Sequence, residues 1–177
     1  MHQIHHNARR SARQLKEICL TKYDHGCSRA EQAPSQVKSA VIIDPATLQP
    51  LQRYKLLIGG IVPRPIALVS TCSAAGAPNL APFSFFAGVG SNPMTLLYCP
   101  ANHPDGSEKD SLRNSKPQAD GGQGEFVVSI VSHSFRHRMA AAAEDLPFEE
   151  SEFNLSGLTP IPSTRVRPPR VGESQVA

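Results

Sequence analysis

Proline and glycine recur so often along this chain that long uninterrupted helices are disfavoured. The 177 residues include sixteen prolines and twelve glycines. Such residues mark turns and irregular loops, so their number argues against an all-helical bundle and favours short strands joined by turns. Hydrophobic residues make up 40% of the sequence, and the length suits one domain plus an extension.

Four short apolar segments are predicted to be β-strands. The first, residues 65–73, is rich in β-branched side chains and ends at a turn that contains glycine and proline. The others are residues 83–89, 94–99 and 125–132, each bounded by proline, glycine or polar residues. The sequence therefore predicts a mainly β fold.

Two helical segments are predicted between and after these strands. Residues 109–114, inside a long polar loop at 100–124, have room for one or two helical turns. A longer helix is predicted to begin after an N-cap at Ser134 and to end at Pro147. Its apolar residues recur at the helical period: Phe135, Met139, Ala142, Ala143 and Leu146. This stripe indicates a helix that covers the core and implies no chemistry.

The last part of the chain shows weaker patterns. The acidic residues 149–152 are expected to form a solvated face, and residues 153–162 are expected to form a loop. Residues 165–171 are interrupted by two prolines, which is typical of an edge segment of a sheet.

The basic charge of the chain is concentrated in residues 1–40. They contain seven basic and three acidic residues, whereas residues 41–177 contain eleven and twelve. We therefore expect no nucleic-acid interface on the domain. An Arg-rich amphipathic segment such as this is typical of a mitochondrial transit peptide. The alternatives are a disordered extension before the domain at 41–177 and a misassigned start codon. With only four cysteines and no C-x-x-C pair, a reducing, cytoplasmic location is the default expectation.

Signatures of membrane insertion, metal binding and nucleophilic catalysis are missing from the sequence. No apolar run approaches the ~20 residues that a membrane span needs. The histidines and cysteines before residue 30 match no zinc spacing, and arginines flank His133 and His137, which disfavours a bound cation there. No G-x-S-x-G, H-E-x-x-H or P-loop motif occurs. We predict no metal and name no catalytic residue.

Three segments have the composition of a ligand site. Arg64 lies between two prolines, where a stiff guanidinium suits an anion, although a surface arginine explains the pattern equally well. Residues 79–86 interleave Asn79 and Ser84 with aromatic residues, as the wall of a planar ligand or a buried strand would. Residues 109–111, Lys-Asp-Ser, combine a charge with a hydroxyl and are suited to a phosphate.

Taken in order, residues 54–71, 76–86 and 109–111 resemble the flavin-reductase-like, FMN-binding split-barrel family, in its flavoredoxin-like branch. The pair P-R-P-I-A-L-V-S-T and N-L-A-P-F-S-F-F is the most specific part of the match. Shorter matches continue it at residues 125–128, 152–153, 157–159 and 168–171. The resemblance covers about residues 41–177.

The resemblance implies a six-stranded Greek-key split β-barrel with one or two covering helices, which forms a homodimer and holds FMN near the subunit interface. It places Ser70, Thr71, Asn79, Ala81 and Ser84 along the flavin and its ribityl chain. It places Arg64 and the motif Lys109, Asp110 and Ser111 on the phosphate side. Phe83 or Phe85 would face the ring. Regular alternation puts both phenylalanines on one face of a strand and Ser84 on the other, so the side chains of Ser84 and Phe83 could not both contact the flavin. A bulge or a backbone contact would resolve this conflict.

The resemblance also implies a function, with departures that bear on it. Ser111 replaces the usual threonine, and the chain stops where family members continue with further strands, so a barrel without its last strands is expected. The leading hypothesis is NAD(P)H-dependent reduction of bound flavin, with electrons passed to an acceptor or a partner oxygenase. The alternatives are a non-enzymatic FMN electron carrier and an inactive, truncated member of the family.

Overall fold

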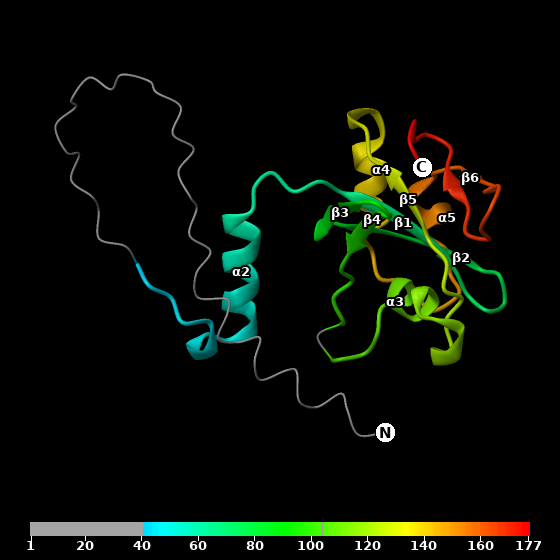
Figure 1. Cartoon of the computed structure of the whole chain (residues 1–177). Helices are drawn as coiled ribbons and strands as arrows, with labels where there is room; N and C mark the ends of the chain where they lie inside the picture. Colours follow the sequence, from blue (N-terminus) through cyan, green and yellow to red (C-terminus); the bar gives the residue numbers. More distant parts are fainter. Residues whose placement is uncertain (1–40, 104) are drawn as a thin grey trace, which may run out of the picture. The chain divides into compact units, whose positions relative to one another are not determined.

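The structure is a computed structural model that describes residues 41–103 and 105–177. The chain divides into two units, Met1–Ala46 and Thr47–Ala177, and the account below concerns the second (Figure 1). The predictions for residues 1–40, including the extension, the transit peptide and the histidine and cysteine cluster, lie outside the described residues. In the part of the chain that is described, no helix has the length and apolar character that crossing a membrane requires.

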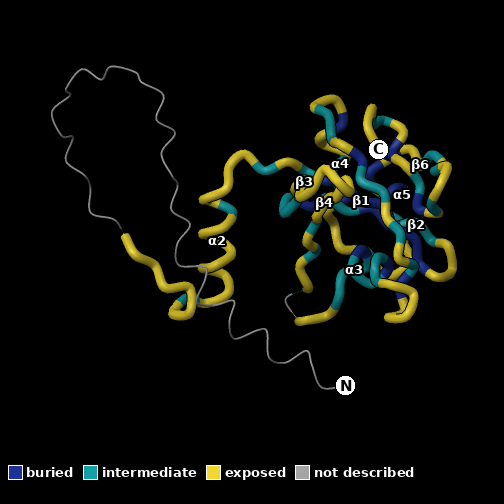
Figure 2. Tube along the Cα trace, viewed as in Figure 1, coloured by how far each residue is buried: buried dark blue, intermediate teal, exposed yellow. Residues whose placement is uncertain are grey.

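A three-stranded antiparallel sheet forms the centre of the domain, in the order β2-β1-β5. Strand β1 (Ala67–Cys72) pairs with β2 (Pro78–Phe83) on one side and with β5 (Val127–Ile130) on the other. Every residue of β1 is buried, as its β-branched and small side chains predict (Figure 2). The predicted strands at 65–73 and 125–132 are thereby confirmed, with shorter bounds.

The turn between β1 and β2 follows the glycine predicted for it. Gly76 has a φ of +89°, which a side chain would strain, and its N–H donates to the Ser73 carbonyl. The Ser73 N–H donates to the Ala77 carbonyl. This tight connection fixes the register in which Thr71 lies opposite Asn79, and this pairing positions the polar groups described below.

The prediction of one strand over residues 83–89 is wrong. Strand β2 ends at Phe83, the chain bends at Ser84 and Phe85, and β3 (Phe86–Ser91) begins a separate hairpin with β4 (Met94–Tyr98). The bend allows Phe83 to pack in the core against Tyr98, at 5.3 Å between ring centroids. It also allows Phe85 to leave the sheet and contact Tyr54. The predicted strand at 94–99 is confirmed as β4.

The helices match the predictions unevenly. Helix α3 (Asp110–Ser115) confirms the helical turns expected in the long loop, which also contains the 3-10 turn Gln118–Asp120. The predicted helix from Ser134 to Pro147 is shorter: a 3-10 turn at His133–Phe135 leads into α4 (Arg136–Ala141), and the helix ends at Ala142. Ser134 is not the N-cap. Its hydroxyl contacts that of Ser132 instead.

Two helices have no counterpart among the predicted elements. Helix α2 (Pro50–Gly60), which follows a 3-10 turn at Pro45–Thr47, has no buried residue. Helix α5 (Glu152–Ser156) replaces part of the predicted acidic face and loop, because Glu152 and Phe153 point into the protein. The expectation that residues 149–152 form a solvated face is therefore wrong at Glu152.

The main core lies between the sheet and the C-terminal elements. Leu68 and Leu80 pack against Phe135 of the 3-10 turn, Phe153 of α5 and Val171. Val171 belongs to β7 (Arg170–Val171), which pairs with β6 (Pro160–Ile161) in a two-residue ladder. The segment predicted at the edge of a sheet thus includes a short strand. The described strands form three separate antiparallel sheets with helices around them, an open arrangement rather than one closed hydrogen-bonded barrel.

Candidate functional site

A groove runs along β2 and the bend that follows it, and we call it the β2 groove. It consists of three adjoining hollows of about 50, 190 and 400 Å³. The first and second hollows share Ala81, Lys109 and Ala143, and the second and third share Ser84, Phe85 and Cys99. The volume of the third hollow lies within the range of roughly 300–1,000 Å³ that is usual for small-molecule sites. The groove is the candidate site.

The first hollow contains half of the polar site residues predicted from the sequence. Asn79, Ala81, Lys109, Asp110 and Ser111 all line it, although they come from two separate segments of the chain. The Asn79 side-chain amide donates to the Ser111 hydroxyl at 3.0 Å, and both residues are buried. This hydrogen bond joins the start of α3 to β2.

A second hydrogen bond of the same kind supports the first. The Asn114 amide donates to the Thr71 hydroxyl at 3.1 Å, and Thr71 lies opposite Asn79 in the β1–β2 register. Two amide–hydroxyl pairs, from neighbouring positions of the sheet, therefore hold α3 against it. Buried polar groups need such partners, and here they orient Ser111.

Asp145 is the ion-pair partner of both Lys109 and His103 in the first hollow. Lys109 Nζ lies 2.9 Å from one Asp145 carboxylate oxygen, and His103 Nδ1 lies 3.6 Å from the other. The hydrogen bond from Lys109 lowers the pKa of Asp145 below its ordinary value. Asp110 pairs with Arg113 at 3.0 Å, one helical turn later.

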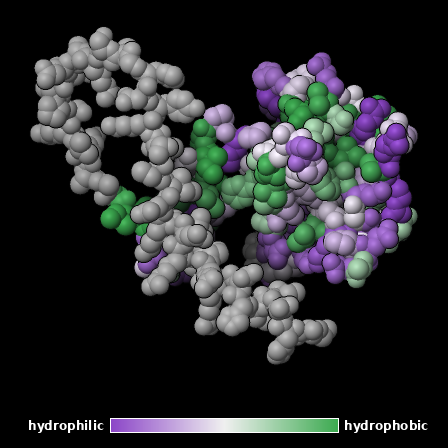
Figure 3. Space-filling model, in the orientation of Figure 1, coloured by the Kyte–Doolittle hydropathy of each residue, from purple (hydrophilic) through white to green (hydrophobic). Residues whose placement is uncertain are grey.

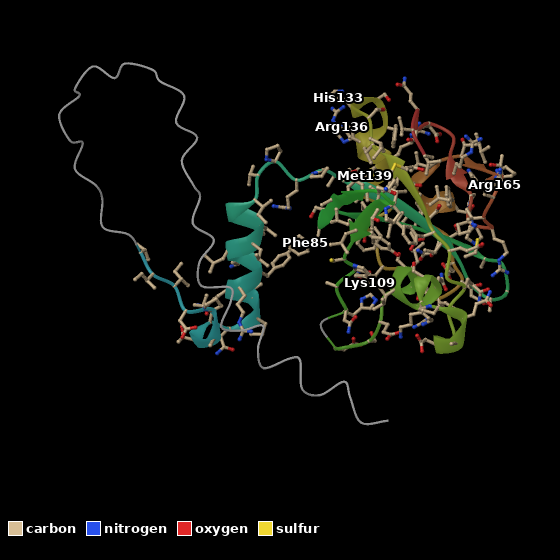
Figure 4. The ribbon with its side chains drawn as sticks, viewed as in Figure 1. Phe85, Lys109, His133, Arg136, Met139 and Arg165 are labelled. Atoms are coloured by element: carbon tan, nitrogen blue, oxygen red, sulfur yellow. The ribbon has the colours of Figure 1, made fainter. Side chains whose placement is uncertain are left out.

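The second hollow gathers Phe83, Ser84 and Phe85, which regular alternation would have separated. The bend after Phe83 resolves that conflict by ending the strand before Ser84. Phe85 projects toward α2, where its ring meets Tyr54 edge to face at 6.0 Å between centroids (Figure 4). The hollow therefore combines aromatic walls with the small residue Ala81 and the Lys109 side chain.

Arg64 lies in the third hollow, apart from Lys109 and Ser111. Its guanidinium donates to the carbonyl oxygens of Ile58 at 2.5 Å and of Ile61 at 3.2 Å, at the C-terminal end of α2. It also donates to the Ser84 hydroxyl at 3.3 Å. The structure thus does not bring Arg64 together with the other predicted phosphate ligands. Helix-terminal carbonyls attract a cation, and they engage this one.

Ser70 and Thr71 are fully buried in β1 and line none of the three hollows. The Ser70 hydroxyl donates to the Pro169 carbonyl at 2.5 Å, and the Thr71 hydroxyl accepts from Asn114. Both hydroxyls therefore make hydrogen bonds within the protein, to the segment before β7 and to α3. Flavin contact through them stays a prediction from the resemblance.

Glu152 is a residue of the site that the sequence reasoning missed. It is buried, lines the first hollow, and accepts a hydrogen bond from the Leu80 N–H at 2.8 Å. Burial raises the pKa of its carboxyl group, although the Leu80 hydrogen bond opposes the rise. The sequence does contain a signal for it, because residues 152–153 are part of the resemblance to the family. The acidic residues next to Glu152 favoured the solvated face that we predicted instead.

The histidines near α4 are remote from these groups. His133 Nδ1 contacts Arg136 Nη1 at 3.2 Å, and both lie near the start of α4, away from Phe85 and Lys109 (Figure 4). Within residues 41–103 and 105–177, no three His, Cys, Asp or Glu side chains are grouped so that they could hold a metal ion.

Comparison with known proteins identifies the class. Residues 59–177 match the family described as the flavin reductase like domain, so this chain belongs to that family. It is 39% identical over 134 residues to an uncharacterized protein of Halalkalibacterium halodurans, covering 76% of this chain and 62% of that one. Among solved structures, nitrilotriacetate monooxygenase component B from Bacillus cereus is 36% identical with a TM-score of 0.69, covering 77% of this chain and 65% of that one.

A more distant structure supports the same architecture. A protein of Shewanella frigidimarina with a split barrel domain is 22% identical with a TM-score of 0.57, covering 73% of this chain and 60% of that one. This likeness shows a split-barrel fold, of which the open sheets described above are part. The chain spans less than two thirds of the length of the curated relatives compared here.

Proposed function

We propose that this chain binds FMN in the β2 groove and takes part in its reduction by NADH or NADPH, with electrons passed to an acceptor or a partner oxygenase. Membership of the flavin reductase like family supports the flavin. The similarity to a monooxygenase component supports the partner oxygenase. The observation that carries the proposal is the convergence of residues 79–85 and 109–111 on one groove.

The residues of the groove fit such a ligand. A flavin has a planar apolar ring system, a chain of hydroxyl groups and a phosphate. The second and third hollows offer aromatic and aliphatic walls, including Phe83, Phe85 and Leu57. The first hollow offers the Asn79 and Ser111 side chains and a lysine. The lining of the groove therefore changes from apolar to polar along its length, as the flavin does.

Binding and orientation are the contributions we assign to the protein itself. When bound, the flavin supplies the hydride and electron chemistry. Phe83 and Phe85 would cover one face of the flavin ring and exclude water. Ser111, whose hydroxyl oxygen accepts a hydrogen bond from Asn79, would donate a hydrogen bond to the polar end of the flavin. No side chain is assigned a proton transfer.

The test begins with the full chain, titrated with FMN while flavin absorbance and fluorescence are followed. NADH or NADPH is then added without oxygen. We expect the flavin spectrum to change on binding and to bleach on reduction. Phe85→Ala should weaken binding, whereas the matched control Phe148→Ala, on an exposed phenylalanine outside the groove, should not.

The outcomes separate the alternatives. A chain that binds FMN but is reduced only when a separate reductase is added would be an electron carrier. A folded chain that binds no flavin would contradict the proposal and favour an inactive member of the family. Homodimer formation, implied by the resemblance, is part of the proposal and is measured by sedimentation. A cytoplasmic or mitochondrial location stays a prediction.

A further inference from the structure

Among the described residues, Lys109 is the only lysine or arginine that lines the first hollow, and a carboxylate already holds it. Asp145 places one oxygen 2.9 Å from Lys109 Nζ and the other 3.6 Å from His103 Nδ1. Both contacts lie at the hollow that also contains Asn79 and Ser111. Asp145 thus occupies the position in which a ligand's anionic group would meet the lysine.

The charge balance of this hollow gives Asp145 its importance. The titratable side chains that line it are His103, Lys109, Asp110, Glu144, Asp145 and Glu152. Asp110 is paired with Arg113, and Glu152 is buried with a backbone N–H as its partner. While Asp145 remains on Lys109, the hollow presents no net positive charge to an incoming anion, and Coulomb repulsion opposes a phosphate.

We propose that Asp145 is a specificity-determining residue: its carboxylate competes with the phosphate of a ligand for Lys109, which reduces the preference for phosphorylated over unphosphorylated flavin. The inference rests on the function proposed above. A phosphomonoester binds here by displacing Asp145, whereas riboflavin, which has the same ring and ribityl chain without phosphate, binds without disturbing the ion pair.

The geometry permits this displacement. The Asp145 side chain is 65% exposed, beyond the end of α4, so it moves into water without unfolding a core element. Exposed ion pairs of this kind are weak because water screens them. A phosphate carries roughly −1.5 to −2 charges at pH 7, against one for the carboxylate, so it competes effectively for the lysine.

The experiment compares the dissociation constants of FMN and riboflavin for the full chain and its variants. Asp145→Asn keeps the shape and removes the charge, and we expect FMN to bind about two- to fivefold more tightly, as the loss of one weak ion pair implies. Riboflavin should change less than about twofold. Lys109→Met should weaken FMN alone, and in the double variant the gain from Asp145→Asn should vanish.

Glu150→Gln is the matched control, since it removes one exposed carboxylate outside the groove. An equal gain in FMN affinity from Glu150→Gln would show a general field effect and overturn the inference, as would equal changes for FMN and riboflavin. Failure of the wild-type chain to bind either flavin would contradict the proposed function instead. Inorganic phosphate then tests the role of Asp145 independently of flavin binding. It should raise the melting temperature of Asp145→Asn more than that of the wild type, and equal shifts would overturn the inference.

Discussion

The central sheet and the β3–β4 hairpin are made from adjacent stretches of sequence, yet their side chains are covered very differently. In β1 all six residues are buried, and polar Ser70 and Thr71 have partners inside the protein. In β3 and β4, most residues are exposed, including the apolar Val89, Met94 and Leu96. Figure 2 shows the contrast as the change from dark blue to yellow.

Helix α2 belongs with the hairpin in this comparison. It has no buried residue, although Leu51, Leu56 and Leu57 are apolar, and Figure 3 shows hydrophobic side chains at the surface over it. Exposed apolar area of this kind marks interaction surfaces in soluble proteins. The difference teaches that the sheet is stabilised by packing within the chain, whereas the hairpin and α2 offer apolar area for a ligand or another chain.

The largest expected effect tests the packing of the sheet. Leu68→Ala removes a fully buried side chain from the main core and should lower the free energy of unfolding by about 2–5 kcal/mol. Met94→Ala is the control in the hairpin, where the side chain is 87% exposed, and it should change the free energy by less than about 0.5 kcal/mol. Urea unfolding measures both. Similar losses for the two variants would break the comparison.

The second effect concerns the polar group that joins α5 to the sheet. Glu152→Ala leaves the Leu80 N–H buried without an acceptor, and the free energy of unfolding should fall by about 1–3 kcal/mol at neutral pH. Glu152→Gln keeps a carbonyl acceptor and removes a buried charge, so it should be close to neutral or stabilising. Equal destabilisation by the two variants would show that the carboxylate charge is required.

The same residue makes a prediction about pH. Burial raises the pKa of Glu152 in the folded protein, so the folded state binds a proton more readily than the unfolded state. Its contribution to stability is therefore greatest below the ordinary glutamate pKa and declines as pH rises through the raised value. Glu152→Gln should remove this decline from the wild-type stability curve. A stability difference between the two proteins that does not vary with pH would contradict the prediction.

The sequence predicted two of the three strands of the central sheet, β1 and β5, because their chemistry is local: both are β-branched runs bounded by turn residues. Strand β2 (Pro78–Phe83) was not predicted, since its two prolines and its small residues give no strand pattern. The predicted turn after β1 contains Gly76, whose φ is +89°. The convergence of Asn79 with Ser111 was also expected, but from the resemblance, since hydrogen bonds between residues 32 positions apart leave no periodic signal.

The failures arise where tertiary contacts outweigh local pattern. The bend at Ser84 separates two β segments because Phe83 packs in the core and Phe85 packs on Tyr54. Glu152 lies in an acidic run, and only its contact with Leu80, 72 positions away, shows that it is buried. Helix α2 was not predicted, and its carbonyl groups hold Arg64, whose contact with a phosphate stays a prediction from the resemblance.

The next prediction concerns how α2 is held without buried residues. Arg64→Met removes the donors to the Ile58 and Ile61 carbonyls and to Ser84, which should cost about 1 kcal/mol or less in global stability. Locally, amide hydrogens of α2 should exchange faster while those of β1 keep their protection. Arg53→Met, which removes one exposed contact to Leu48, is the control. Unchanged exchange in α2 would show that Arg64 does not anchor it.

The smallest effect on stability tests what covers the hairpin. If the second copy in the proposed homodimer packs on the hairpin, Leu96→Lys should shift sedimentation from dimer toward monomer by placing a charge in an apolar interface. Because Leu96 is 46% exposed in the single chain, unfolding of the monomer should change by no more than about 0.5 kcal/mol. Glu150→Lys, a change of charge on an exposed residue outside the hairpin, should leave the dimer intact. A chain that is monomeric before any substitution would show that no second copy covers the apolar surface of the hairpin.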